Sequence, residues 1–168
     1  MRRALSSLAL CVSCLSCGYS FAQRGPSAQA PLRVAPLGNF TPQAEAAGLF
    51  SSELRAQLES RGRLAKESSS APLLEGELVT LRDSPSALGL SGVQTFRVDA
   101  ELHVRVRDSS QAEVYADGAA GSEDYLAGVD VLGTEANRRA ALRRLSRSLA
   151  REIFERLEVA ERFGRGAK

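Results

Sequence analysis

The residue types that usually carry enzyme chemistry are scarce in this sequence. There is one histidine, His103, and all three cysteines lie near the N-terminus, at positions 11, 14 and 17. His103 stands in a stretch of alternating polarity, so we expect a solvated strand residue there and not a general base. Glu123-Asp124 is a lone acidic pair, and one histidine without a nearby thiol cannot build a common zinc site. The sequence therefore predicts no catalytic residue, no metal and no cofactor.

Arginine offers a different chemistry, because its planar guanidinium binds phosphates and carboxylates through two parallel hydrogen bonds. Twenty of the 22 basic residues are arginines. Three of them are predicted on the polar face of one long strand and a fourth at the adjoining hairpin. All four are our candidates for binding a phosphorylated amphiphile: Arg97, Arg105, Arg107 and Arg82. A second set lies on the C-terminal helix: Arg138, Arg139, Arg143, Arg144, Arg147 and Arg151. That second set is either a solvated face or a surface for phosphates and acidic lipids, and both interpretations stay open.

The overall charge excludes a large class of partners. The net charge of +2 comes from Arg2 and Arg3, and without these two residues 20 basic face 20 acidic residues. A strong positive field of the kind that attracts nucleic acid is therefore not expected.

The N-terminus has the pattern of an export signal. Met1-Arg2-Arg3 is followed by an uncharged, largely apolar run to Ser16, about a dozen residues long, which suits a signal peptide and is too short to span a bilayer. Leu15-Ser16-Cys17 is similar to a bacterial lipobox, with Cys14 where leucine is usual. We expect cleavage before Cys17 and acylation of Cys17, since several acyl chains anchor a protein stably. The alternatives are cleavage before Cys14 and ordinary cleavage near Ala22.

Hydrophobic periodicity predicts two helices. Ala46, Phe50, Leu54 and Leu58 recur at helical spacing within residues 43–61, with Thr41 as the expected N-cap, Pro42 in the first turn and Gly62 at the C-terminal end. The second helix is predicted over residues 134–160, with Thr134 near its N-cap. Its apolar stripe consists of Leu142, Leu145, Leu149, Ile153 and Leu157.

Alternation of apolar and polar residues predicts four strands, over residues 32–37, 73–82, 93–108 and 112–119. Pro36 favours an edge position for the first strand. Residues 83–92 and 122–134 are expected to be long connections. The order strand, helix, three strands, helix indicates an α+β two-layer sandwich, with two helices on a four-stranded, mostly antiparallel sheet. We assign residues 1–16 to a signal peptide, 17–31 to a lipidated tether, 32–163 to the domain and 164–168 to a tail.

Several stretches together resemble the LptE family of outer-membrane lipopolysaccharide-assembly lipoproteins. They are Cys17-Gly18-Tyr19-Ser20-Phe21, residues 32–41, residues 74–78, Tyr125 and residues 135–142. The resemblance implies the same element order and a protein that is not an enzyme. It differs at the connection 83–92, which has no Lys or Arg between Ser84 and Gly92. We therefore expect lipopolysaccharide to be contacted by Arg82, Arg97, Arg105 and Arg107 instead of by this connection.

The resemblance also implies a function and a location. A lipid-anchored protein on the periplasmic side of the outer membrane would plug an LptD-type β-barrel, help it assemble, and assist lipopolysaccharide on its way to the surface. The main alternative is an outer-membrane lipoprotein that activates a periplasmic peptidoglycan synthase or serves another export machine. An envelope hydrolase is a further alternative, opposed by the missing nucleophile and base.

Overall fold

The computed structural model describes residues 29–88 and 94–164. Its elements follow in the order β1 (Arg33–Val34), β2 (Gly38–Asn39), α1 (Ala46–Ser60), β3 (Leu73–Leu88), β4 (Gln94–Arg107), β5 (Glu113–Leu126) and α2 (Val131–Gly164). The predicted signal peptide, Cys17, nearly all of the tether, residues 89–93 and the last four residues lie outside the described part of the chain.

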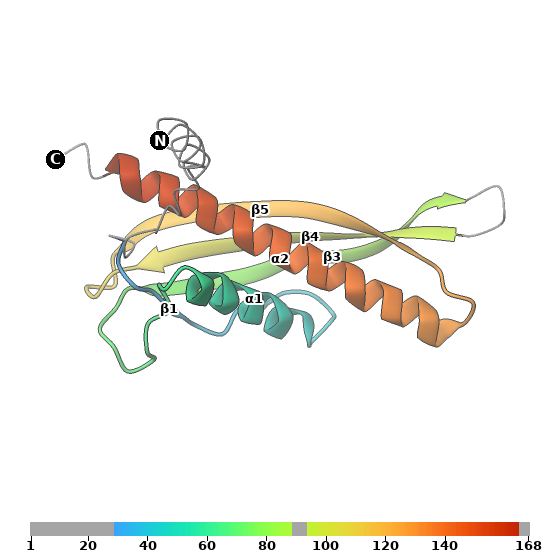
Figure 1. Ribbon diagram of the computed structural model, residues 1–168, viewed down its shortest axis with the longest axis horizontal. Helices are drawn as coiled ribbons and strands as arrows, with labels where there is room; N and C mark the ends of the chain where they lie inside the picture. The colour runs from blue at the N-terminus through green and yellow to red at the C-terminus, as the bar shows by residue number, and fades with distance from the viewer. Residues whose placement is uncertain (1–28, 89–93, 165–168) are drawn as a thin grey trace, which may run out of the picture.

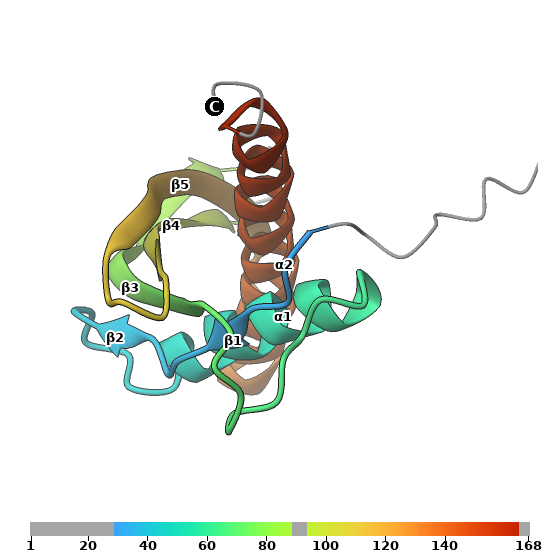
Figure 2. The same cartoon turned by 90° about the vertical axis from the view of Figure 1, so that its left-hand side faces the viewer.

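Three long strands form the body of the sheet, in the order β1-β3-β4-β5. β3, β4 and β5 are antiparallel, whereas the short β1 and β2 run parallel to β3. The sheet is strongly curved, and α2 lies along the open side of the curve with α1 beside it (Figure 2). This arrangement confirms the predicted α+β fold of two helices on a mostly antiparallel sheet.

The core lies between the helices and the concave face of the sheet. Its fully buried side chains come from both layers and include Phe50, Leu54, Leu58, Leu74, Leu78, Val98, Leu102, Ile153 and Phe154. The predicted apolar stripes of both helices are buried, and so is every second residue of β4 from Val98 to Val106. The other face of β4 carries its polar residues, as the alternation predicted.

The first predicted strand is present as two short pieces on the sheet edge. Ala35 still donates its backbone hydrogen bond to Leu74 O (2.9 Å), but Pro36 has no amide hydrogen, and regular pairing resumes only at Gly38. The expected edge position is confirmed, because β1 pairs only with β3.

The prediction of a long connection at residues 83–92 is wrong, because β3 continues to Leu88 (Figure 1). Two register shifts, at Leu78/Thr80 and Pro85/Ala87, interrupt the alternation that the sequence pattern relied on. Unbroken alternation would place Thr80 on the apolar face with Leu74, Gly76 and Leu78, but the first shift moves it off that face. Its hydroxyl donates to Glu101 on the polar face (3.3 Å), while Leu81 continues the core.

The fourth strand and the second helix are both longer than predicted. β5 continues to Leu126, which pairs with Thr95, so most of the expected connection 122–134 is strand or helix. α2 begins at Val131, not Thr134. The N-cap is Asp130, whose carboxylate accepts the Gly133 N–H (2.7 Å).

The start of α1 is also corrected. The helix begins at Ala46, and its N-cap position, Glu45, makes no side-chain capping bond. Thr41 is not the cap, because its hydroxyl donates to the Asn39 side chain (2.8 Å) in the preceding turn. Gly62 follows the helix with a φ of +65°, the left-handed conformation expected of a glycine at this place.

Candidate functional site

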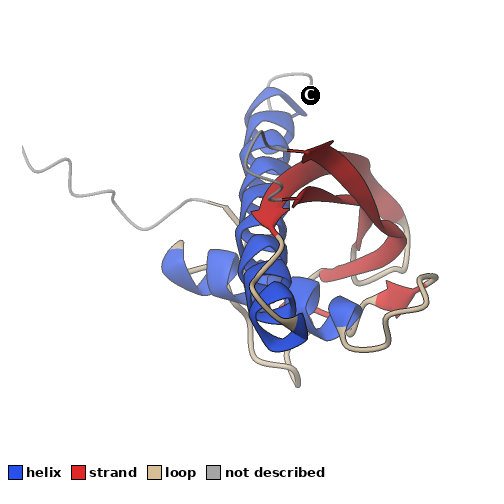
Figure 3. Cartoon of the chain, turned by 90° about the vertical axis from the view of Figure 1, so that its right-hand side faces the viewer, coloured by secondary structure: helices blue, strands red, loops and turns tan. Residues whose placement is uncertain are grey.

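The four arginines predicted to bind lipid all lie on the convex, polar face of the sheet. Arg97, Arg105 and Arg107 alternate with the buried residues of β4, and Arg82 of β3 stands opposite Asp99 on the same face. Neither helix covers this face (Figures 2 and 3). The structure thus brings the four residues to one surface.

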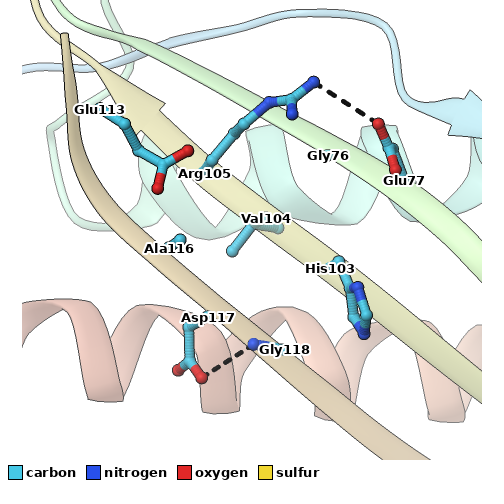
Figure 4. A pocket seen from close by; sticks show the side chains of 9 residues that line it. All are labelled: Gly76, Glu77, His103, Val104, Arg105, Glu113, Ala116, Asp117 and Gly118. Carbon is cyan, nitrogen blue, oxygen red and sulfur yellow. Dashed lines mark hydrogen bonds and ion pairs between the residues drawn. The ribbon is translucent and has the colours of Figure 1, made fainter.

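A shallow hollow of about 400 Å³ opens on this face beside Arg105 (Figure 4). Its rim carries Glu77 and His103, while β5 contributes two carboxylates and two small residues, Ala116 and Gly118. Gly118 stands opposite His103, and a Cβ added there would come within 2.8 Å of the imidazole ring. The missing side chain at Gly118 therefore lets the His103 ring lie over β5 and keeps the hollow open.

The arginines at this end of the face are neutralised by carboxylates of β3. Arg105 Nε lies 2.9 Å from Glu75 and its Nη2 lies 3.5 Å from Glu77. Arg107 Nε lies 3.1 Å from the same Glu75 oxygen, although the two are not aligned as a hydrogen bond. Both pairs are partly exposed, so a ligand phosphate would have to compete with Glu75 for the two guanidinium groups.

The remaining two candidates lie at the other end of the face. Arg97 is eight residues from Arg105 along β4, a separation of about 27 Å. It binds Asp124 through two hydrogen bonds of 2.9 and 3.3 Å. This contact lowers the pKa of Asp124 and raises the pKa of Arg97. Arg82 is exposed and has no ion pair among the described residues. The four arginines are thus two separate pairs on one face and not one cluster.

The single histidine of the polar face is paired with a carboxylate. His103 Nε2 lies 3.0 Å from Glu101, and both side chains are about half exposed. Within residues 29–88 and 94–164, no group of three histidine, cysteine, aspartate or glutamate side chains is arranged to hold a metal ion. Guanidinium groups held on rigid strands can bind a phosphate only where it displaces their carboxylate partners.

A polar cluster that the sequence did not predict lies on the opposite, concave face. Arg138 of α2 forms a two-pronged contact with Asp83 of β3, with distances of 3.0 and 3.1 Å, and Tyr125 donates to the same carboxylate (3.0 Å). These contacts tie the extended β3–β4 hairpin to the N-terminal half of α2. Burial, and then the bond to Asp83, raise the pKa of Tyr125 to about 12. No sequence signal could reveal the cluster while residues 83–92 were taken as a loop.

The comparisons with known proteins identify the family. A family model for LptE, described as lipopolysaccharide-assembly, matches residues 30–157, which include every strand and most of α2. The chain belongs to the LptE family. The predicted membership is thereby confirmed, and the membership supports an envelope lipoprotein concerned with lipopolysaccharide assembly in a non-enzymatic family.

Solved structures share the LptE-like fold at low sequence identity. A putative lipoprotein from Caulobacter crescentus superposes with a TM-score of 0.54 at 15% identity, covering 74% of this chain and 89% of that one. The rare lipoprotein B from Shewanella oneidensis gives 0.52 at 14% identity, covering 77% and 96%. No curated protein sequence matches the chain. At these identities the likeness concerns the fold alone, so the roles of individual arginines need their own evidence.

Proposed function

We propose that this protein is an outer-membrane lipoprotein that plugs an LptD-type β-barrel, helps it assemble and assists lipopolysaccharide transport to the cell surface. The observation that carries the proposal is the LptE family match over nearly the whole described domain. In the same proposal, Cys17 is acylated and holds the domain at the periplasmic face of the outer membrane. Among the described residues, no helix is both long and apolar enough to cross a bilayer.

The shape of the domain supports the plug. α2 has 34 residues and is therefore about 50 Å long, and the three long strands run beside it (Figure 1). The outer face of the sheet is polar and uncovered by the described helices. A narrow body with charged outer surfaces can enter a water-filled barrel without burying unpaired charge, because barrel interiors are themselves polar.

Purification from detergent-extracted outer membranes tests the partner. An affinity-tagged chain should retain a large outer-membrane β-barrel protein in near-stoichiometric amount. Recovery of a peptidoglycan synthase without any barrel protein would contradict the plug and favour the alternative of a cell-wall activator. A chain with Cys17→Ser, which cannot be acylated at that position, separates anchoring from partner binding.

Charge reversal on the sheet tests the lipid role. Arg97→Glu with Arg105→Glu should weaken lipopolysaccharide binding, because both changes place a carboxylate where a phosphate would bind. The matched control is Arg97→Asp with Asp124→Arg, which keeps the ion pair and the net charge. If the double glutamate variant binds lipopolysaccharide as well as the wild type, these residues are not the lipid site.

A further inference from the structure

The outer side of α2 carries an unusual concentration of positive charge. Residues 137–151 contain six arginines and no aspartate or glutamate. Arg138 and Arg144 turn toward the sheet, where they bind Asp83 (3.0 Å) and Glu123 (3.1 Å). The other four are exposed and recur every fourth residue, so they form a row along the solvent side of the helix: Arg139, Arg143, Arg147 and Arg151.

Arg97, Arg105 and Arg107 of the sheet all have a carboxylate partner, whereas only two of the four arginines in this row have one among the described residues. Arg139 Nε lies 2.9 Å from the Glu135 carboxylate, and Arg147 Nε lies 3.7 Å from that of Glu53. Arg143 and Arg151 have no ion pair with any residue in the described parts of the chain. Like charges four residues apart on a helix repel each other, so the row is a site where an external anion would relieve repulsion.

The path of the N-terminal chain places this side of α2 near the proposed anchor. Arg63 is buried and binds Glu161 near the end of α2 (2.7 Å), and it also donates to Ala30 O (3.1 Å). The described chain therefore begins beside the C-terminal end of α2, on the side away from the sheet (Figures 2 and 3). The 12 residues from Cys17 to position 28 can span at most about 40 Å.

We infer that the outer face of α2 rests on an anionic lipid surface, with Arg143, Arg147 and Arg151 contacting headgroup phosphates. This contact goes beyond plugging a barrel, since it holds the domain against the bilayer independently of any protein partner. It also orients the domain, because the tether and the cationic face then meet the same membrane.

Vesicle flotation tests the inference. The chain from residue 17 onward, with Cys17→Ser so that no acyl chain contributes, is mixed with phosphatidylcholine vesicles, with or without about one-third phosphatidylglycerol. With α2 unchanged, this chain should bind only the anionic vesicles, and added salt should weaken the binding. Changing Arg143, Arg147 and Arg151 to glutamine should weaken binding about 100-fold, since each arginine near an anionic surface contributes about fivefold.

The matched comparison is the sheet triple Arg97→Gln, Arg105→Gln and Arg107→Gln, which removes the same charge from the other face. It should change vesicle binding far less than the helix triple does. Equal losses from both triples, or no anionic-vesicle binding by the parent chain, would overturn the inference. A helix triple that loses lipopolysaccharide binding but keeps phosphatidylglycerol binding would also overturn it, while leaving the proposed lipopolysaccharide function intact.

Discussion

Replacing Arg63 should reveal how strongly the N-terminal chain is attached to the domain. Its side chain is 1% exposed, and it donates to Glu161, to Ala30 O and to the Gln29 side chain. Removing one partner of a buried ion pair costs about 3–5 kcal/mol. Because Glu161 is 22% exposed and water can reach it, we expect Arg63→Ala to lower the free energy of unfolding by about 3 kcal/mol.

The loss should be measured by urea unfolding, with hydrogen exchange as a local probe. The Leu32 amide donates to Arg63 O (2.8 Å), so its exchange should accelerate more than that of amides in the middle of β4. The control is Arg63→Met with Glu161→Leu, which removes both charges and should recover part of the stability. If Arg63→Ala costs less than about 1 kcal/mol, the contact is no more than a surface ion pair and the reasoning fails.

Further predictions concern glycines, pH and the anchor. Gly48→Ala should stabilise by about 0.5–1 kcal/mol in urea unfolding, because the added methyl meets nothing within 4 Å inside α1. Gly76→Ala should destabilise by about 1–3 kcal/mol, because the methyl would lie 2.9 Å from the backbone oxygen of His103. The free energy of unfolding should fall between about pH 10 and 12, since the unfolded chain releases the Tyr125 proton first, and Tyr125→Phe should reduce this slope. Mass spectrometry of the membrane form should find an acylated N-terminal Cys17, and an unmodified N-terminus beyond residue 17 would contradict the anchor.

The sequence predicted those elements whose local pattern agrees with their packing. β4 alternates without interruption, so its buried and polar faces were both correct. The helices were found because apolar residues such as Phe50 and Ile153 recur at helical spacing and are fully buried. In each case a single periodicity extends over several helical turns or strand residue pairs. The local pattern alone therefore identifies the side of the element that is buried.

The errors occurred where the backbone departs from a simple period. The shift at Leu78/Thr80 moves the following residues of β3 to the opposite face, so Leu81 enters the core where the alternation placed Thr80. Pro85 and the serines beside it are typical of a loop, yet β3 continues through them. β1 and β2 pair with β3 only as far as Leu78, so around Pro85 β3 pairs with β4 alone and a missing amide hydrogen is tolerated. The contact between Asp83 and Arg138 could not be predicted, because it joins residues 55 positions apart through that extended strand.

The two sets of arginines show why residue type alone does not define an anion-binding surface. Arg105 lies directly opposite Glu75 in the β3–β4 register. The ion pair between them neutralises a guanidinium that the sequence pattern predicted to be free to bind a ligand. Arg143 lies on a helix face where the residues one turn before and after it are also arginines, so no acidic partner can come from its own helix. A phosphate approaching Arg97, Arg105 or Arg107 must displace a carboxylate. One approaching Arg143 or Arg151 meets a guanidinium that has no ion pair among the described residues. We therefore expect α2 to contribute more than the sheet to binding lipid headgroups, and the sheet to contribute where a ligand can replace its carboxylates.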